Sequence, residues 1–313
     1  KVEIIALDKT GTITSGEPRV TDIIPNETSE TELMKLAVSL ESRSEHPLAK
    51  AIIIKAKEMN ILADEVTDFK ALIGNGLSAR LNNKEIFAGS IGFVTSKLSL
   101  SDDIISKAEK LANEGKTPLF FANSEKLIGI VAVADVVKED SPRAIKELQN
   151  MGIRIVMLTG DNERTANAIG KQVGVDEVIA GVLPDGKEET IRKLKSRGSV
   201  AMVGDGINDA PVLTISDIGV AMGGLGSDAA IEAADIVIMT DETSKISKAI
   251  NLSKKTMRIV HENIIFAIFV KIAVLVLTAF GASTMWEAVF ADVGVSVIAI
   301  INALRMLNIK KFE

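Results

Sequence analysis

Short apolar runs rich in β-branched residues recur along the chain, and helical patterns separate most of them. The runs lie at 2–7, 127–134, 153–158, 199–203, 217–221 and 235–239. Alternation of such runs with helices predicts parallel strands in a sheet that helices cover on both faces. We therefore expect an α/β fold in which the strand at 2–7 joins the sheet formed after residue 127.

Acidic residues follow three of these runs, at the point where each strand should end. They are Asp8 after 2–7, Thr159-Gly160-Asp161 after 153–158, and Asp205 with Asp209 after 199–203. One Gly-Asp pair is usually a turn. Three such groups should converge, because ligands of open parallel sheets bind beyond the carboxyl ends of the strands. Asp8 and Asp205 are candidates to share a Mg²⁺ ion, which prefers carboxylate oxygens and substrate phosphate.

The residues that follow Asp8 are of types that can bind an anion such as phosphate. Lys9-Thr10-Gly11-Thr12 supplies a cation, two hydroxyls and a glycine that lets backbone N–H groups converge. Asp8 is therefore a candidate nucleophile for phosphoryl transfer, and an aspartate that caps a turn is the alternative. Lys187, at a helix start, is a candidate to neutralise charge on the transferring phosphoryl group, although alone it would be a surface lysine.

Residues 15–126 have a mixed α+β pattern and are long enough to form a lobe of their own. Ser29-Glu30-Thr31-Glu32 is a capping box that predicts one helix, and Pro47 starts another that ends near Met59. Short alternating strands are expected near 66–73, 77–81 and 85–89. We interpret this segment as an insertion into the parallel-sheet domain.

Two apolar stretches near the end of the chain, 263–281 and 286–304, would each form a helix about 28 Å long, which matches a bilayer core. Lysine and arginine flank the pair at both outer ends and are absent from the loop between them. This charge distribution predicts a membrane hairpin with both ends in the cytoplasm. The alternative is a pair of buried helices in a soluble core.

Composition excludes several other classes of protein. A net charge of −6, without basic tracts interleaved with aromatics, argues against binding of nucleic acid. The absence of cysteine excludes disulfides and thiolate metal sites within this chain. Because the chain begins directly with a strand at Lys1, we expect it to be the C-terminal part of a longer protein.

The three acidic motifs, in this order, resemble the phosphorylation signatures of the P-type ATPases: Asp8-Lys9-Thr10-Gly11-Thr12, Thr159-Gly160-Asp161 and Gly204-Asp205-Gly206-Ile207-Asn208-Asp209. The resemblance implies a haloacid-dehalogenase-like Rossmannoid core in which ATP phosphorylates Asp8. The implied catalytic residues are Asp8, Lys9, Thr10, Thr159, Gly160, Asp161, Lys187, Asn208 and Asp209, and the implied Mg²⁺ site comprises Asp8, Thr10 and Asp205. Phosphatases of that superfamily carry a second aspartate where this chain has Thr10, so we expect a persistent phosphoenzyme.

The inserted lobe resembles the nucleotide-binding domain of the heavy-metal-transporting branch. The residues on which this resemblance rests are Glu41 and His46, followed by Gly74, Gly76 and Gly89. The resemblance implies that Glu41 and His46 help to hold adenine and that the glycines line its pocket. Asp135 and Lys138 resemble the hinge that returns from this lobe.

Lys271 and Asp292 lie inside the two apolar stretches, where charges are costly and usually functional. Counted from the outer loop, the two are close enough in depth to pair. Hard ligands favour a borderline divalent ion over Cu(I). Lys271 with Asp292-Val293-Gly294 resembles the zinc/cadmium/lead-exporting subgroup. We predict Asp292 as a ligand of the transported ion and Lys271 as its counter-charge, with a purely structural ion pair as the alternative.

These observations predict five parts, two of which comprise two segments each. They are a discontinuous phosphorylation domain at 1–14 and 127–250, a nucleotide-binding domain at 15–126, a juxtamembrane linker at 251–262, transmembrane helices at 263–281 and 286–304, and a cytoplasmic tail at 305–313. We expect a multi-pass cell-membrane protein whose membrane helices contact lipid and whose catalytic domains lie in the cytoplasm. It is expected to export Zn²⁺, Cd²⁺ or Pb²⁺ using ATP and Mg²⁺.

The actuator loop and the upstream membrane helices of such pumps are missing here, so we expect this chain to need them as partners. Two other functions stay open. One is a membrane-anchored phosphatase of the same superfamily, and the other is a truncated, non-transporting nucleotide-binding module.

Overall fold

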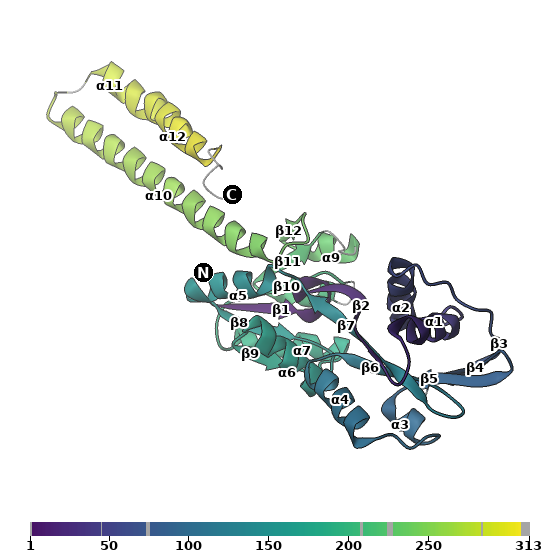
Figure 1. Ribbon diagram of the computed structural model, residues 1–313. Coiled ribbons are helices and arrows are strands. Elements are labelled where there is room, and N and C mark those ends of the chain that lie inside the picture. Colours follow the sequence, from purple (N-terminus) through teal and green to yellow (C-terminus); the bar gives the residue numbers. More distant parts are fainter. Residues whose placement is uncertain are drawn as a thin grey trace. The chain divides into compact units, whose positions relative to one another are not determined.

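The computed structural model describes residues 2–44, 46–72, 76–206, 209–223, 228–282 and 284–307 (Figure 1). The chain forms two compact units, Lys1–Thr243 and Ser244–Glu313, and each is described by itself.

The first unit contains a sheet of six parallel strands in the order β12-β11-β10-β1-β8-β9. Their bounds are β1 (Ile4–Asp8), β8 (Arg154–Leu158), β9 (Glu177–Ile179), β10 (Val200–Gly204), β11 (Ile218–Met222) and β12 (Ile236–Ile238). β1 lies between β8 and β10, so the predicted parallel sheet and the place of the first strand in it are confirmed. The carboxyl ends of β1, β8 and β10 therefore share one edge.

Helices cover both faces of this sheet. Their bounds are α5 (Ser141–Asn150), α6 (Glu163–Val173), α7 (Pro184–Lys195), α8 (Ala210–Ile215) and α9 (Asp228–Ala233). Ile4 and Ala6 pack with buried side chains of α7, α8 and α9 on one face. Ile5 and Leu7 alternate with them and so point to the other face, where α5 and α6 pack on β8 and β9.

The same pair of hydrogen bonds from an aspartate recurs at the opposite, amino-terminal edge of the sheet. An aspartate before one strand donates its N–H to a carbonyl on the neighbouring strand, and its carboxylate accepts the N–H of that same neighbouring residue. The pairs are Asp176 with Ile155, Asp217 with Val200, and Asp235 with Gly219. Each carboxylate satisfies a strand-end donor that would otherwise need water.

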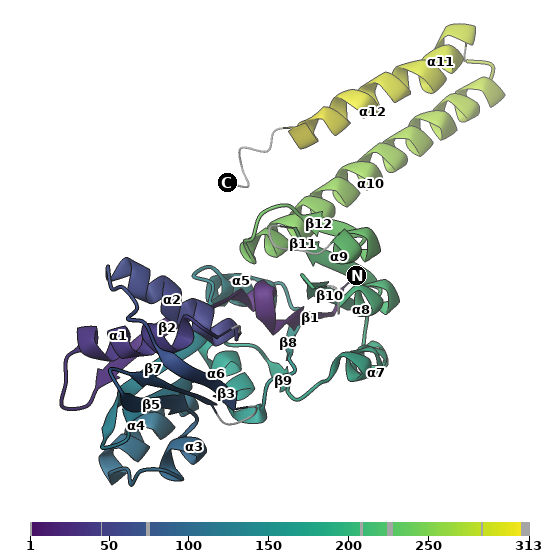
Figure 2. The ribbon, with the colours of Figure 1, turned by 90° about the vertical axis from the view of Figure 1, so that its right-hand side faces the viewer.

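The second sheet is antiparallel, in the order β2-β7-β6-β5-β4-β3. Its strands are β2 (Thr14–Pro25), β3 (Thr67–Leu72), β4 (Gly76–Leu81), β5 (Lys84–Gly89), β6 (Thr117–Asn123) and β7 (Leu127–Val137). α1 (Glu30–Glu41) and α2 (Pro47–Glu58) pack on one face, and α3 (Ile91–Thr95) and α4 (Asp102–Asn113) on the other (Figures 1 and 2). The predicted helices and short strands of this α+β segment are therefore present.

The placement of 127–134 in the parallel sheet is wrong. This segment belongs to β7, which pairs antiparallel with both β2 and β6. A central antiparallel strand with helices on both faces is as continuously apolar as a parallel strand, so the two cannot be told apart by pattern. The chain enters the second sheet through β2 and leaves it through the adjacent β7.

Ser141 precedes a proline and so has the pattern of an N-cap, but it is the first residue of α5, after Asp140. Its hydroxyl donates to the carbonyl of Ile13 at 2.9 Å and bonds the hydroxyl of Thr243. This hydroxyl therefore ties the start of α5 to the segment after Asp8 and caps no N–H group.

The second unit is a helical hairpin of α10 (Ser244–Ala279) and a helical run over Met285–Leu307, made of α11 (Met285–Val289), a turn at Phe290–Gly294, α12 (Val295–Ala303) and a last turn at Leu304–Leu307. Both helices are long and apolar enough to cross a membrane. The predicted linker at 251–262 is part of α10. Only 6% and 12% of the two apolar windows are buried, which argues against the alternative of helices inside a soluble core.

Candidate active site

Asp8 is the last residue of β1 and is only 7% exposed. Its Oδ1 accepts a hydrogen bond from Lys187 Nζ at 2.6 Å, and its Oδ2 accepts one from the backbone N–H of Thr10 at 3.1 Å. Asp8 therefore does cap the turn that follows it, and it also faces a buried cation. A turn alone would not require the lysine.

Lys187 joins two carboxylates, that of Asp8 at the end of β1 and that of Asp209 just before α8. Its ammonium lies 2.6 Å from Asp8 Oδ1 and 2.8 Å from Asp209 Oδ1, and the residue is 8% exposed. Burial alone would lower the pKa of Lys187, but the two carboxylates outweigh burial and raise the pKa. Lys187 therefore stays charged where a phosphoryl group on Asp8 would need a cation.

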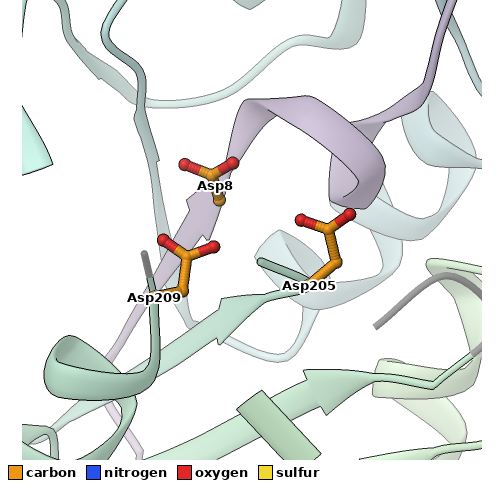
Figure 3. A group of neighbouring side chains, drawn as sticks. All are labelled: Asp8, Asp205 and Asp209. Atoms are coloured by element: carbon orange, nitrogen blue, oxygen red, sulfur yellow. The ribbon is translucent and has the colours of Figure 1, made fainter. Parts of the chain in front are cut away.

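Three carboxylates meet at the edge of the sheet: Asp8, Asp205 and Asp209, with one oxygen from each within 4.8 Å of the others (Figure 3). Burial, followed by repulsion from Asp209, raises the pKa of Asp8 to about 6 and that of Asp205 to about 6. One lysine does not balance three carboxylates. A hard divalent cation would, and oxygen ligands of this kind suit Mg²⁺.

Gly11 leaves the space that Asp205 fills. Its φ is +69°, and a β-carbon there would lie 1.6 Å from Asp205 Oδ2. The loop after Asp8 can approach the end of β10 this closely only with glycine at position 11.

Asp161 contacts Asp8 only indirectly, through the neighbouring lysine. Lys9 Nζ donates to Asp161 Oδ2 at 2.8 Å, and the N–H of Asp161 donates to the hydroxyl of buried Thr159 at 3.1 Å. Gly160 lies between them, and a β-carbon there would meet the carbonyl of Val182 at an ordinary contact distance of 3.5 Å. The motif therefore fixes the lysine beside Asp8.

The segment that returns from the second sheet also contacts the Asp8 loop. Asp135 accepts from the hydroxyl of Thr14 at 2.5 Å and the N–H of Gly16 at 2.9 Å. Lys138 donates to the carbonyl of Gly11 at 2.6 Å and pairs with Asp241 at 2.7 Å. Sequence reasoning found Asp135 and Lys138 but missed Asp241, which follows a strand with no distinguishing motif.

The predicted adenine residues lie on the second sheet and its helices. Glu41 ends α1 and is 6% exposed, and burial raises its pKa to about 7 despite a hydrogen bond from Ser44. His46 is exposed and caps α2, with its Nδ1 accepting the N–H of Leu48 at 3.2 Å. This is the helix-terminal role that histidine often has, and it does not occupy Nε2.

Gly76 and Gly89 are direct partners across β4 and β5. A β-carbon on Gly76 would lie 2.9 Å from the Cα of Gly89 and 2.0 Å from the carbonyl oxygen of Ala88. The strands are therefore bare of side chains at this pair. Gly74 and Asn208 lie outside the described residues.

In the hairpin, Lys271 Nζ lies 3.3 Å from Asp292 Oδ1, so the two predicted charges are brought together. Asp292 sits in a widened turn, where the N–H of Val295 donates to the carbonyl of Phe290, five residues earlier. Such turns are frequent at functional sites. The contact does not itself separate a metal site from a structural ion pair.

A family model described as haloacid dehalogenase-like hydrolase matches residues 2–214, and a second model with the same description matches 187–250. The chain belongs to the haloacid dehalogenase-like hydrolases. Within this family it is similar to a probable cadmium-transporting ATPase of Staphylococcus aureus (strain MRSA252), with 42% identity over 99% of this chain and 44% of the relative. It is also similar to a copper-exporting P-type ATPase of Staphylococcus saprophyticus, with 42% identity over 99% of this chain and 38% of that relative.

Among solved structures, a zinc-transporting PIB-type ATPase in the E2.Pi state matches with a TM-score of 0.90 and 37% identity, over 98% of this chain and 50% of that chain. These findings confirm the resemblance to the heavy-metal P-type ATPases and the expected fold. The chain spans less than half the length of the curated relatives named above.

Proposed function

We propose that this chain carries the ATP-driven phosphorylation machinery of a heavy-metal exporter, with Asp8 as the phosphorylated residue. The observation that carries the proposal is the buried Asp8–Lys187–Asp209 bridge at the carboxyl edge of the sheet. An oxygen of Asp8 attacks the γ-phosphorus of ATP, the bond from that phosphorus to the bridging oxygen breaks, and ADP leaves with the electron pair. Lys187 offsets the charge that gathers on the transferred group.

A Mg²⁺ ion fits the residues that are present. Asp8 and Asp205 supply carboxylates, Thr10 belongs to the same loop as Asp8, and the carboxylate oxygens lie close enough to share one ion. Burial first, and repulsion from Asp209 second, raise the pKa of both acids, so a cation would favour their ionised forms. When bound, Mg²⁺ would neutralise phosphate charge. Asp209 is held by Lys187 at one oxygen and by the N–H of Gly206 at the other, so its role is to place that lysine.

The phosphatase alternative is disfavoured at one position. A phosphatase of this superfamily uses a second acid two residues after the nucleophile, and here that residue is Thr10, which is exposed. Without that acid, water attack on the acyl phosphate lacks proton transfer, which usually contributes about 10² or more to the rate. We expect the phosphoenzyme to last long enough to drive a conformational change.

The antiparallel sheet and its helices form the proposed nucleotide-binding domain. The predicted limits of 15–126 become 14–137 when β2 and β7 are counted with their sheet. Glu41 offers an oxygen to the adenine amino group, His46 offers Nε2, and the bare Gly76–Gly89 pair lets a flat ring approach the strands. This division leaves phosphorylation to the parallel sheet.

For transport, we propose a membrane-embedded hairpin with the catalytic unit in the cytoplasm, Asp292 as a ligand of a Zn²⁺- or Cd²⁺-like ion, and Lys271 as its counter-charge. The 3.3 Å contact between them places the counter-charge beside the proposed ligand, and in this proposal the pair opens when an ion arrives. Oxygen ligands and the absence of cysteine in this chain favour a borderline divalent ion. Lipid and the rest of the longer protein are the further partners of this proposal.

The test is incubation of the full chain with γ-labelled ATP and Mg²⁺. We expect an acid-stable, hydroxylamine-labile label that Asp8→Asn abolishes. Asp103→Asn is the matched control, because Asp103 is exposed and, within the described part of the chain, pairs with Lys107 on its own helix. Rapid turnover of simple phosphate esters would favour the phosphatase, and absence of both labelling and nucleotide binding would contradict the proposal.

A further inference from the structure

A second set of polar side chains joins the two helices of the hairpin, several turns away from Lys271 and Asp292. Asn263 Nδ2 donates to the carbonyl of Ala299 at 3.1 Å, and Asn302 Nδ2 donates to Asn263 Oδ1 at 2.8 Å. Arg305 Nη1 donates to Asn302 Oδ1 at 2.8 Å and to Glu262 Oε2 at 3.2 Å. We call these four side chains, Glu262, Asn263, Asn302 and Arg305, the clasp.

The clasp is a continuous chain of hydrogen bonds between α10 and the second helix. Both asparagines are half-buried, whereas Arg305 and Glu262 are more exposed. Both asparagines lie near the same end of the proposed membrane spans, and a polar side chain that bonds across two membrane helices adds to their association. The arrangement therefore favours one relative position of the two helices over neighbouring ones.

The clasp and the Lys271–Asp292 pair lie in the same antiparallel register. Asn263 precedes Lys271 by eight residues on α10, and Asn302 follows Asp292 by ten on the second helix. At 1.5 Å per residue these separations are about 12 and 15 Å. A slip by one turn would move Asp292 about 5 Å along its helix and out of reach of Lys271.

The widened turn at Phe290–Gly294 gives the clasp a specific task. Asp292 lies within this turn, and a β-carbon at Gly294 would lie 2.5 Å from the Phe290 ring. A turn of this kind interrupts the regular hydrogen-bond ladder and is a place where a helix can kink. The helix end beyond it must be fixed if Asp292 is to keep its place.

We propose that the clasp is a positioning device that sets the register of the hairpin and so holds Asp292 opposite Lys271. The consequence for metal binding rests on the proposed function of Asp292. The register itself does not, and the two can fail separately.

The absence of cysteine makes a direct test possible. Lys271→Cys and Asp292→Cys are introduced together in the full chain, reconstituted in phosphatidylcholine vesicles, and cross-linked with a short bifunctional thiol reagent. These changes remove the ion pair and leave the clasp in place, so the contribution of the clasp to the register can be measured without the ion pair. Adding Asn263→Leu with Asn302→Leu should slow cross-linking about tenfold, the effect of losing two interhelical hydrogen bonds in a membrane.

Thr278→Val is the matched control, because the Thr278 hydroxyl bonds the carbonyl of Val274 on its own helix. It should leave the rate unchanged. Far-UV circular dichroism checks that the double leucine variant keeps its helices, and Asn302→Ala, a smaller change, replaces it if it does not. Equal cross-linking rates with an intact and a disrupted clasp would overturn the proposal.

Zn²⁺ titration of the chain separates the two claims. If both hold, Asp292→Ala and the double leucine variant each weaken Zn²⁺ binding, and Thr278→Val does not. If Asp292→Ala leaves Zn²⁺ binding unchanged while cross-linking still depends on the clasp, the ligand assignment fails and the register proposal stands. If Asp292→Ala weakens binding while the leucine variant matches the control in both assays, the clasp proposal fails.

Discussion

Gly11 and Asp205 lie so close that a single added methyl group at position 11 would overlap the Asp205 carboxylate. The two residues are far apart in the sequence of the first unit and meet where the loop after Asp8 approaches the end of β10. Gly11→Ala should displace either the loop or the carboxylate, and phosphorylation should fall at least about 100-fold because both belong to the reacting site.

Gly152→Ala is the control for this substitution. Gly152 has a φ of +77°, similar to the +69° of Gly11, but nothing lies within 4 Å of a β-carbon there. It should lose about 1 kcal/mol of stability from the backbone alone and keep its activity. Equal loss of labelling in both variants would show that backbone strain, and not the contact with Asp205, is responsible.

Lys187→Ala should abolish labelling by ATP and destabilise the first unit. It leaves Asp8 and Asp209 buried without their cation, which typically costs about 3 kcal/mol. Lys193→Ala on the same helix removes only an exposed pair with Glu189 and should change neither property measurably. Thermal unfolding and labelling of both variants check this, and a fully active Lys187→Ala protein would refute the role of this lysine.

Glu41 should make the stability of the first unit fall as pH rises. Its pKa is raised by burial from 4.5 to about 7, so the folded state holds the proton more tightly than the unfolded state. The loss of folding stability caused by ionising the buried Glu41 is absent below about pH 4.5 and grows between pH 4.5 and about 7. It is complete above about pH 7, where it amounts to about 3 kcal/mol. Glu41→Gln should therefore stabilise the protein at pH 8 and not at pH 5, as measured by urea unfolding.

The same variant tests the adenine assignment. An amide keeps a carbonyl acceptor but adds a donor where the carboxylate had none, so ATP binding at pH 8 should weaken. Glu58→Gln on α2 is the control, because Glu58 is exposed and pairs with Lys55. A Glu41→Gln protein with the stability and ATP affinity of the wild type at both pH values would contradict both the raised pKa and the binding role.

The recurrent aspartates at the amino edge of the parallel sheet predict a purely structural effect. Asp235→Ala removes the acceptor of the Gly219 N–H and should cost about 1–2 kcal/mol of stability. Lys107→Ala, which removes an exposed pair with Asp103, should cost about 0.5 kcal/mol or less. Similar denaturation midpoints for the two variants would show that water replaces the lost carboxylate.

The centre of the parallel sheet and its acidic edge could be predicted because β1, β8 and β10 are each a short apolar run that ends in a motif. Asp8, Asp161, Asp205 and Asp209 then follow from one rule about strand ends. The contact between Gly11 and Asp205 could not be predicted, because nothing in either local sequence specifies a distance between residues so far apart in the chain.

Other elements are harder to predict from the sequence, for different reasons. β9 and α9 are too short to show a period, and β7 has the composition of a parallel strand although it is central in an antiparallel sheet. The helix α4 is a different case, because it has an amphipathic pattern that could have predicted it. Its buried side chains are Ile104, Ala108 and Leu111, and Ser101 caps its first turn.

The central claim is that Asp8 forms an acyl phosphate with ATP, and reductive trapping tests it most directly. The full chain is incubated with ATP and Mg²⁺, quenched in acid, reduced with borohydride, and digested for mass spectrometry. The account predicts homoserine at position 8, dependent on both ATP and Mg²⁺. ATP consumption with unmodified Asp8, or trapping at a different residue, would contradict it.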